Sequence, residues 1–106
     1  MMRHISVFRL KPECRTPEII QSVAAQLRAL PQALSTITDC EIGVKPFPGP
    51  SESPNGAVQF YDLIQIITFA TEEDCMAYPT TQAHNDFLAA SHDYMEQVIV
   101  LDYPVE

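Results

Sequence analysis

The chain has 106 residues, of which 46% are hydrophobic and 19% are charged, and its formal net charge is −8. This length fits a single domain spanning residues 1–106, and this hydrophobicity excludes an intrinsically disordered chain. All six Lys and Arg residues lie within the first 45 positions, so the remainder carries acidic charges alone. Because phosphate groups are bound by clustered cations, we expect neither nucleic acid nor an anionic membrane surface as a partner.

The expected location of the protein follows from its N-terminus and its cysteines. Charged residues interrupt the first eleven positions, which is unlike the apolar region of a signal peptide, and no apolar run approaches the ~20 residues of a membrane helix. Cys14, Cys40 and Cys75 are widely spaced, unlike a disulfide framework or a zinc ribbon. We therefore expect a cytoplasmic protein in which each cysteine packs as a small hydrophobe.

The first predicted element is a strand over residues 3–10. Its alternation places His4, Ser6 and Phe8 on one face and Ile5 on the other. We expect the helices to cover the face that carries His4. A histidine in such a place is more often a satisfied core residue than a catalyst.

A helix is predicted next. Thr16 is suited to its N-cap and Pro17 to its first position, and apolar residues then recur at helical spacing. Pro31 lacks a backbone N–H, so we expect the helix to end or kink near Leu30 and to restart for one turn. An irregular strand over residues 37–47 follows.

The second half opens with a Pro- and Gly-rich segment, 46–56, which we interpret as a loop. Helix-cap and breaker residues then delimit four further elements. These are a strand over 57–69, a short helix from Thr71 to Tyr78, a helix over 82–95 and a closing strand over 98–103. The β-α-β-β-α-β order predicts an α+β, ferredoxin-like fold, in which an antiparallel sheet carries helices on one face.

Apolar residues on both faces of the later strands predict a partner. In the third strand, Ile64 and Ile66 point one way while Leu63 and Ile67 point the other. Two helices cover only one face of a four-stranded sheet, and open apolar patches beyond roughly a few hundred Å² are rare on monomers. We therefore expect a homodimer that stacks sheet on sheet. Shielding of the open face by the 46–56 loop is the alternative.

The histidines are candidates for chemistry because imidazole titrates near neutral pH. His84 opens the last predicted helix, where the helix dipole favours a neutral imidazole that can act as a base; a plain surface histidine is the alternative. His92 precedes Glu96 by four residues, and we expect the two to form a solvated pair.

No HxH or HxxxH spacing and no nucleotide-binding motif occurs, so we expect no metal and no cofactor.

Five segments, spread from the first strand to the last, follow a recognisable pattern. They are Arg3 to Pro12, Gly43, Tyr61-Asp62, Tyr78 to Phe87 and Val100 to Tyr103. Together they resemble the stress-responsive dimeric α/β-barrel family, usually called Dabb, over essentially the whole chain. The resemblance implies a homodimer of ferredoxin-like subunits whose sheets pack into a barrel, in agreement with the element order above.

The resemblance also implies a site. In polyketide cyclases of this family a tyrosine and a histidine work as a pair, and these match Tyr78 and His84. The closing-strand aspartate that orients the catalytic imidazole matches Asp102, and the strand histidine of the pocket matches His4. Leu63 stands where the cyclases have a second pocket histidine. The expected substrate-binding walls are Phe8, Tyr61, Leu63, Phe87 and Tyr94.

These residues predict proton-transfer chemistry at a carbonyl. A neutral His84 held by Asp102 would remove a proton α to a carbonyl, while Tyr78 donates to the enolate oxygen. We therefore expect a cofactor-free lyase or cyclase of the aldol type, acting on a small, apolar carbonyl compound. A dimer that binds such a ligand without converting it is one alternative, and a purely structural dimer is another. The related antibiotic-biosynthesis monooxygenases rank lower, because the chain has no tryptophan.

Overall fold

The computed structural model describes residues 1–45 and 61–106, so the expected loop over 46–56 and the start of the expected third strand lie outside the described residues. Within the two described ranges, four strands and three α-helices follow one another. Their bounds are β1 Met2–Leu10, α1 Pro17–Ala33, β2 Ile37–Val44, β3 Leu63–Phe69, α2 Glu72–Ala77, α3 Gln82–Ser91 and β4 Met95–Pro104. Three short 3₁₀ turns are interspersed, at Pro12–Cys14, Tyr78–Thr80 and His92–Tyr94.

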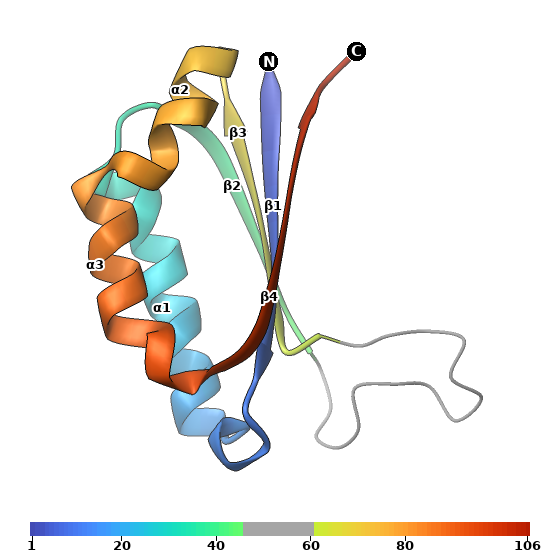
Figure 1. The fold of residues 1–106 in the computed structure, drawn as a ribbon, viewed down its shortest axis with the longest axis vertical. Coiled ribbons are helices and arrows are strands. Elements are labelled where there is room, and N and C mark those ends of the chain that lie inside the picture. The colour runs from blue at the N-terminus through green and yellow to red at the C-terminus, as the bar shows by residue number, and fades with distance from the viewer. Residues whose placement is uncertain (46–60) are drawn as a thin grey trace.

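The strands form one antiparallel sheet in the order β2-β3-β1-β4, so β1 and β3 are central and β4 is an edge strand. Helices α1 and α3 lie side by side over one face of this sheet, and α2 continues the layer beyond the N-terminal end of α3 (Figure 1). The predicted ferredoxin-like α+β fold, with its helices on one face, is confirmed.

A threonine side chain caps the N-terminus of each of these three helices. The sequence predicted such a cap for two of them, at Thr16 and Thr71. Thr16, Thr71 and Thr81 each accept a hydrogen bond from the backbone N–H three residues later, at 3.3, 3.1 and 3.3 Å. Each contact satisfies one of the backbone donors that a helix start leaves without an internal partner. The cap at Thr81 fixes the start of α3, and thereby the position of His84.

Helix α1 continues through Pro31 to Ala33, so the expected end of the helix near Leu30 is wrong. Proline has no N–H to donate to the carbonyl four residues earlier, which here belongs to Leu27. Gln65, buried in β3, supplies the missing donor: its Nε2 lies 3.3 Å from the Leu27 carbonyl oxygen. A tertiary contact thus replaces the hydrogen bond that the proline removes.

The last helix is shorter than expected and the last strand is longer. Helix α3 ends at Ser91, whose hydroxyl donates to the Phe87 carbonyl at 2.7 Å, and β4 begins at Met95. The expected pair of His92 with Glu96 is therefore wrong, because the two residues do not share a helix. His92 lies 3.5 Å from Asp93, and Glu96 lies 3.3 Å from a guanidinium nitrogen of Arg15.

Strand β3 spans Leu63–Phe69, and Asp62, just before it, turns its side chain into the core. This fully buried carboxylate accepts the Leu10 backbone N–H at 2.8 Å. It also lies 3.4 Å from Nε of Arg15 and 3.3 Å from Nζ of Lys45. A buried carboxylate needs such compensation, and the cluster joins one end of β1 to the start of β3.

The predicted alternation of the central strands is confirmed. Every second residue of β1 from His4 to Leu10 is buried beneath the helices, and β3 repeats this through Leu63, Gln65 and Ile67. The opposite face carries half-buried aliphatic side chains and the more exposed ones of β4. Its apolar members are Ile5, Val7, Ile64, Ile66, Ile99 and Leu101.

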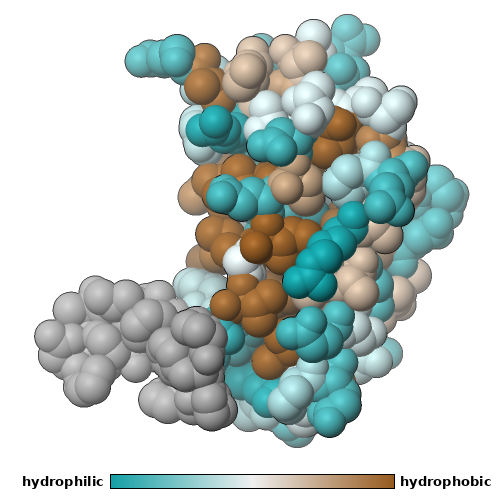
Figure 2. Space-filling model, turned by 180° about the vertical axis from the view of Figure 1, so that it is seen from behind, coloured by the Kyte–Doolittle hydropathy of each residue, from teal (hydrophilic) through white to brown (hydrophobic). Residues whose placement is uncertain are grey.

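Part of the molecular surface is formed by hydrophobic side chains. Seen from behind the view of Figure 1, a band of hydrophobic side chains runs along the molecule (Figure 2). Strand β4 is nearest the viewer in Figure 1 and therefore lies on the side away from the viewer in Figure 2; its Val98 and Val100 are 43% and 49% exposed and its Leu101 is 55% exposed. Among the described residues, no helix has the length and hydropathy to cross a membrane.

Candidate active site

A cavity of about 330 Å³ lies between helix α3 and the half of the sheet formed by β1 and β4. Its polar wall includes six side chains with acid–base or nucleophilic groups, which are those of His4, Ser6, Tyr78, His84, Ser91 and His92. Its apolar wall is formed by Phe8, Phe87, Leu88, Met95, Val98 and Val100. The volume is at the lower end of the range for ligand pockets, and a mostly apolar wall with a few convergent polar groups is typical of them.

His4 is held by a carboxylate from the neighbouring strand. The antiparallel register pairs His4 directly with Asp102, and Nδ1 of His4 lies 2.6 Å from Oδ1 of Asp102. An ionised carboxylate only accepts hydrogen bonds, so Nδ1 carries the proton. The imidazole is buried, whereas the Asp102 side chain is 39% exposed at the edge strand.

The other ring nitrogen of His4 faces Ser6. The distance from Nε2 to the Ser6 Oγ is 3.2 Å, and both residues are buried on the same face of β1. With Nδ1 protonated, Nε2 of a neutral His4 is an acceptor, so the Ser6 hydroxyl donates to it. Ser6, His4 and Asp102 therefore form one continuous hydrogen-bonded chain.

Tyr78 lies between the two imidazoles of the cavity. Its ring is edge-on to His4, with centroids 5.1 Å apart, and edge-on to His84, with centroids 4.9 Å apart. Burial, aided by the charge of Cys40, raises the pKa of Tyr78 to about 12. The phenol therefore stays protonated at neutral pH and is available as a hydrogen-bond donor.

His84 is kept neutral by its surroundings. Burial, followed by the charge of His4, lowers the pKa of His84, and hydrogen bonding to the Pro79 backbone opposes them. Nδ1 of His84 is buried and has no hydrogen-bond partner among the described residues. A neutral imidazole with a free ring nitrogen at the wall of a cavity can accept or donate a proton.

Cys75 completes the surroundings of Asp102. The thiol is buried and free, and Cys14 and Cys40 are also free but only half-buried. Burial, the charge of Asp102 and a hydrogen bond to that carboxylate raise the pKa of Cys75 to about 11. The thiol therefore stays protonated and donates to Asp102, which helps to hold the carboxylate.

His4, Cys75 and Asp102 also offer a possible set of metal ligands, since their ligand atoms lie within 4.8 Å of one another. However, the 2.6 Å between His4 and Asp102 is a hydrogen-bond length, and a metal would need both atoms without the shared proton. As arranged, the three groups form a hydrogen-bonded cluster, and not a metal shell.

The structure brings most of the expected site together but changes one pairing. Of the expected catalytic residues, Tyr78 and His84 line the cavity side by side, and the expected binding residues His4, Phe8 and Phe87 line it too. The expected pairing of Asp102 with His84 is wrong, because Asp102 is bonded to His4.

Three expected wall residues lie elsewhere. Leu63 is buried in the core beneath the helices, and Tyr94 packs against the edge of that core. Tyr61 precedes β3, and its ring lies 4.8 Å from the guanidinium carbon of Arg9, a residue of the open sheet face. A cation over an aromatic face is favourable, which explains why Tyr61 turns away from the cavity.

Sequence reasoning missed Ser6 as a site residue, although alternation already places it beside His4. It also missed Val98 and Val100, which form a wall of the cavity because α3 leaves the helix-side face of β4 partly uncovered. The signal for these two was the pairing of β4 with β1 in the predicted fold, which places Val98 opposite Phe8 and Val100 opposite Ser6.

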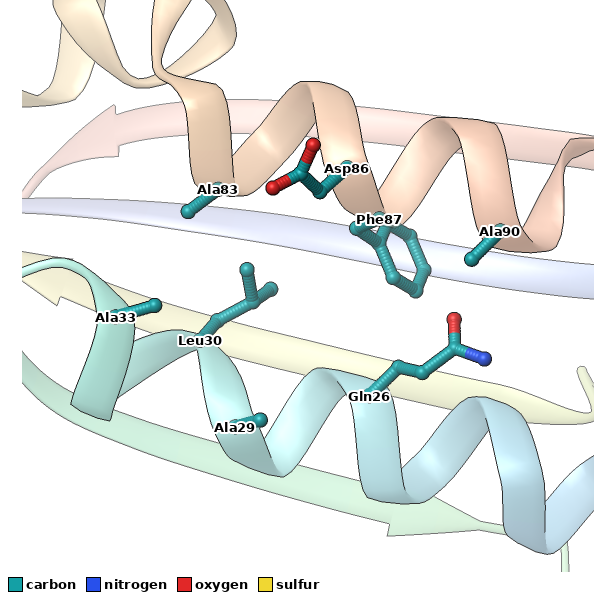
Figure 3. A pocket seen from close by; sticks show the side chains of 8 residues that line it. All are labelled: Gln26, Ala29, Leu30, Ala33, Ala83, Asp86, Phe87 and Ala90. Carbon is teal, nitrogen blue, oxygen red and sulfur yellow. The ribbon is translucent and has the colours of Figure 1, made fainter.

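A second cavity, of about 230 Å³, opens between α1 and α3. Figure 3 shows small side chains from both helices facing this gap, with Gln26 and Phe87 opposite each other across it. The lining is formed by Gln26, Ala29, Leu30, Ala33, Ala83, Asp86, Phe87 and Ala90. It contains no imidazole, thiol or hydroxyl, so the candidate chemistry belongs to the first cavity.

Several solved structures are similar to this chain. A crystal structure of an Arabidopsis thaliana protein matches with a TM-score of 0.81 at 21% identity, covering 100% of this chain and 96% of that one. A dimeric ferredoxin-like protein of unknown function from Thermobifida fusca matches with a TM-score of 0.76 at 20% identity, covering 98% and 90%. A hydroxynitrile lyase from Passiflora edulis matches with a TM-score of 0.76 at 18% identity, covering 99% and 93%. These likenesses show a shared fold.

The sequence itself identifies the family. No curated protein matches the chain, but the family model described as Stress responsive A/B Barrel Domain, or Dabb, matches residues 2–105. This match spans nearly the whole chain and agrees with both the ferredoxin-like fold and the segments that resembled the family. The chain therefore belongs to the stress-responsive A/B barrel domain family, Dabb.

Proposed function

We propose that this Dabb protein is a cofactor-free lyase or cyclase that acts on a small, apolar carbonyl compound. The observation that carries the proposal is the placement of Tyr78 edge-on to His84 in the wall of a mostly apolar cavity. One group is a protonated phenol and the other a neutral imidazole, which are the acid and the base that carbonyl chemistry requires.

In the proposed reaction, His84 removes a proton from the substrate. Negative charge then develops on the carbonyl-derived oxygen, and the Tyr78 hydroxyl donates a hydrogen bond to it. A positioned base of this kind contributes roughly 10²–10⁴-fold to the rate. Because Asp102 is bonded to His4, we assign His4 to substrate binding, and among the described residues Asp102 does not orient His84.

The similar hydroxynitrile lyase supports the choice of reaction class. A hydroxynitrile is the cyanide adduct of a carbonyl compound, so its cleavage also needs a base at a carbonyl-derived oxygen. An aldol-type cyclisation removes a proton from the carbon α to a carbonyl, whereas a hydroxynitrile cleavage removes one from a hydroxyl, but both need a base beside a hydrogen-bond donor, as His84 is beside Tyr78.

A ligand-binding protein without turnover is the second candidate. The observation that favours it is the pairing of Asp102 with His4, because the proposed base then lacks the carboxylate that usually orients a catalytic imidazole. Both candidates place a small apolar carbonyl compound in the same cavity, and only turnover separates them.

To test the proposal, the purified protein is incubated with two probes, an aromatic hydroxynitrile and an aromatic β-hydroxy ketone. Turnover is measured as the amount of aldehyde released. We expect His84→Ala to abolish release while the melting temperature stays close to that of the wild type. Asn85→Ala, at an exposed neighbouring position of α3, is the control and should retain activity. Binding of the probes without any release by the wild type would favour the second candidate.

We also propose a cytoplasmic homodimer that buries the open face of the sheet. Leu101 is 55% exposed on that face beside Ile5, and the similar Thermobifida fusca protein is dimeric. We expect Leu101→Asp to convert the dimer to a monomer in light scattering. Met76→Asp changes a residue of α2 that is 67% exposed on the helical layer, and should leave the dimer intact.

A further inference from the structure

Ser6, His4 and Asp102 form a hydrogen-bonded line, of which the proposed lyase reaction uses only His4, for substrate binding. Asp102 Oδ1 lies 2.6 Å from Nδ1 of His4, and Nε2 of His4 lies 3.2 Å from Oγ of Ser6. A carboxylate on one ring nitrogen and a hydroxyl on the other is the arrangement that activates a serine as a nucleophile.

We infer that Ser6 is the nucleophile of a second activity, acyl transfer from an ester or thioester of a small apolar acid to water. Ser6 and His4 both line the 330 Å³ cavity, so a bound ester can reach the serine hydroxyl. The apolar wall of Phe8, Phe87 and Val98 suits the acyl chain. The activity goes beyond the proposed lyase, whose base is His84.

The first half-reaction forms an acyl-enzyme. The Ser6 Oγ–H proton moves to Nε2 of His4 while a bond forms between Oγ and the acyl carbon. The bond from that carbon to the leaving oxygen or sulfur then breaks, and His4 gives its proton to the leaving group. Asp102 stabilises the imidazolium in between without taking its proton.

The second half-reaction returns the free enzyme. Water gives a proton to Nε2 of His4 while its oxygen bonds to the acyl carbon. The bond between that carbon and Ser6 Oγ breaks, and Ser6 regains its proton from His4. The products are a carboxylic acid and an alcohol or thiol, and no electrons are exchanged with any other reagent.

The oxyanion of this reaction must be stabilised by side chains. Strand β1 is paired on both sides, with β3 and with β4, so its backbone N–H groups are already used in the sheet. The Tyr78 hydroxyl lies in the same wall, and its ring is edge-on to His4. Its pKa of about 12 keeps it a donor. We assign Tyr78 as the oxyanion donor.

The Asp102 carboxylate is held by a second hydrogen bond besides the one to His4. The buried Cys75 thiol donates a hydrogen bond to Asp102 and stays protonated, with its pKa raised to about 11. Asp102 is thereby held between the thiol and the His4 imidazole, although it is partly exposed at the edge strand. Two such contacts favour the single rotamer that orients His4 towards Ser6.

The test is acylation of the full chain by p-nitrophenyl acetate. We expect a burst of p-nitrophenolate and, after an acid quench, a mass increase of one acetyl group that peptide mapping places on Ser6. Ser6→Ala should lose both the burst and the adduct. Ser22→Ala, which changes an exposed serine of α1, is the matched control and should acylate like the wild type. Asp102→Asn should slow the burst by at least ~100-fold and keep the adduct on Ser6.

Two results would overturn the inference. One is a wild-type chain without an adduct on Ser6. The other is an adduct that maps to Cys75 or Ser91 instead, although the Ser91 hydroxyl already donates to the Phe87 carbonyl. These results do not decide the lyase proposal, because that proposal is tested by aldehyde release, which needs no acyl adduct on Ser6. Circular dichroism of each variant checks that the fold is retained.

Discussion

The carboxylate of Asp102 lies 2.6 Å from Nδ1 of His4, directly across the ladder between β4 and β1. This contact separates the polar groups of the cavity into two sets, one around His4 and one around His84. It turns Nε2 of His4 towards Ser6, and it leaves His84 as a neutral imidazole beside Tyr78. One cavity thus contains two different acid–base arrangements, one on the sheet and one on the helix side.

Replacing Asp102 by Asn should change His4 and spare His84. The amide loses the charge that fixes the proton on Nδ1 of His4, so ¹⁵N NMR should show that imidazole as a mixture of tautomers. Because Asp102 is 39% exposed, we expect the free energy of unfolding to fall by only about 1 kcal/mol. A change confined to the His84 resonances would contradict the pairing.

Stability should decrease on the acid side of neutrality because of His84. Burial, and then the charge of His4, lowers its pKa in the folded state, so the unfolded chain binds the proton more readily. The stabilisation is complete above the unfolded pKa of about 6.5 and is lost as the pH falls through the folded pKa. We expect the melting temperature to fall in this window, and to fall less in His84→Gln. Equal slopes for the two proteins would show that His84 does not contribute.

The contact between Gln65 and the Leu27 carbonyl should depend on Pro31. Gln65→Leu leaves this buried carbonyl without a donor and should cost about 1–3 kcal/mol of unfolding free energy. In a Pro31→Ala background, the alanine N–H can bond to the same carbonyl, so the loss should be smaller. Urea denaturation of the four proteins in a double-mutant cycle measures the difference. Additive losses would mean that the two residues act independently.

A side chain at Gly43 should destabilise the fold. It pairs with Ile64 across β2 and β3, and a Cβ added to Gly43 would lie 2.7 Å from Cγ2 of Ile64. Gly43→Ala must therefore displace a branched side chain or the strand, at a cost of about 1–3 kcal/mol in unfolding free energy. In a Gly43→Ala/Ile64→Ala double mutant the added methyl should cost less, because Cγ2 is gone. If the alanine costs as much there as it does beside Ile64, the clash is not its cause.

Signals within the chain predicted much of this protein. Threonines before helical stripes located the starts of α1 and α2, and alternation in β1 placed His4 on the face beneath the helices. These signals succeed because capping and strand pleat depend on residues that are close in sequence. They failed at Pro31, where a residue of another strand compensates for the missing N–H.

The sequence by itself determined the ferredoxin-like order, the apolar character of both sheet faces, and the nearness of Tyr78 to His84, which are six residues apart. Only the tertiary structure decided that Asp102 binds His4 across 98 positions of the chain, and that Tyr61 turns to Arg9 instead of the cavity. The reason is that strand register follows from the packing of the whole sheet. A carboxylate therefore finds its imidazole through the ladder, which a local pattern does not encode.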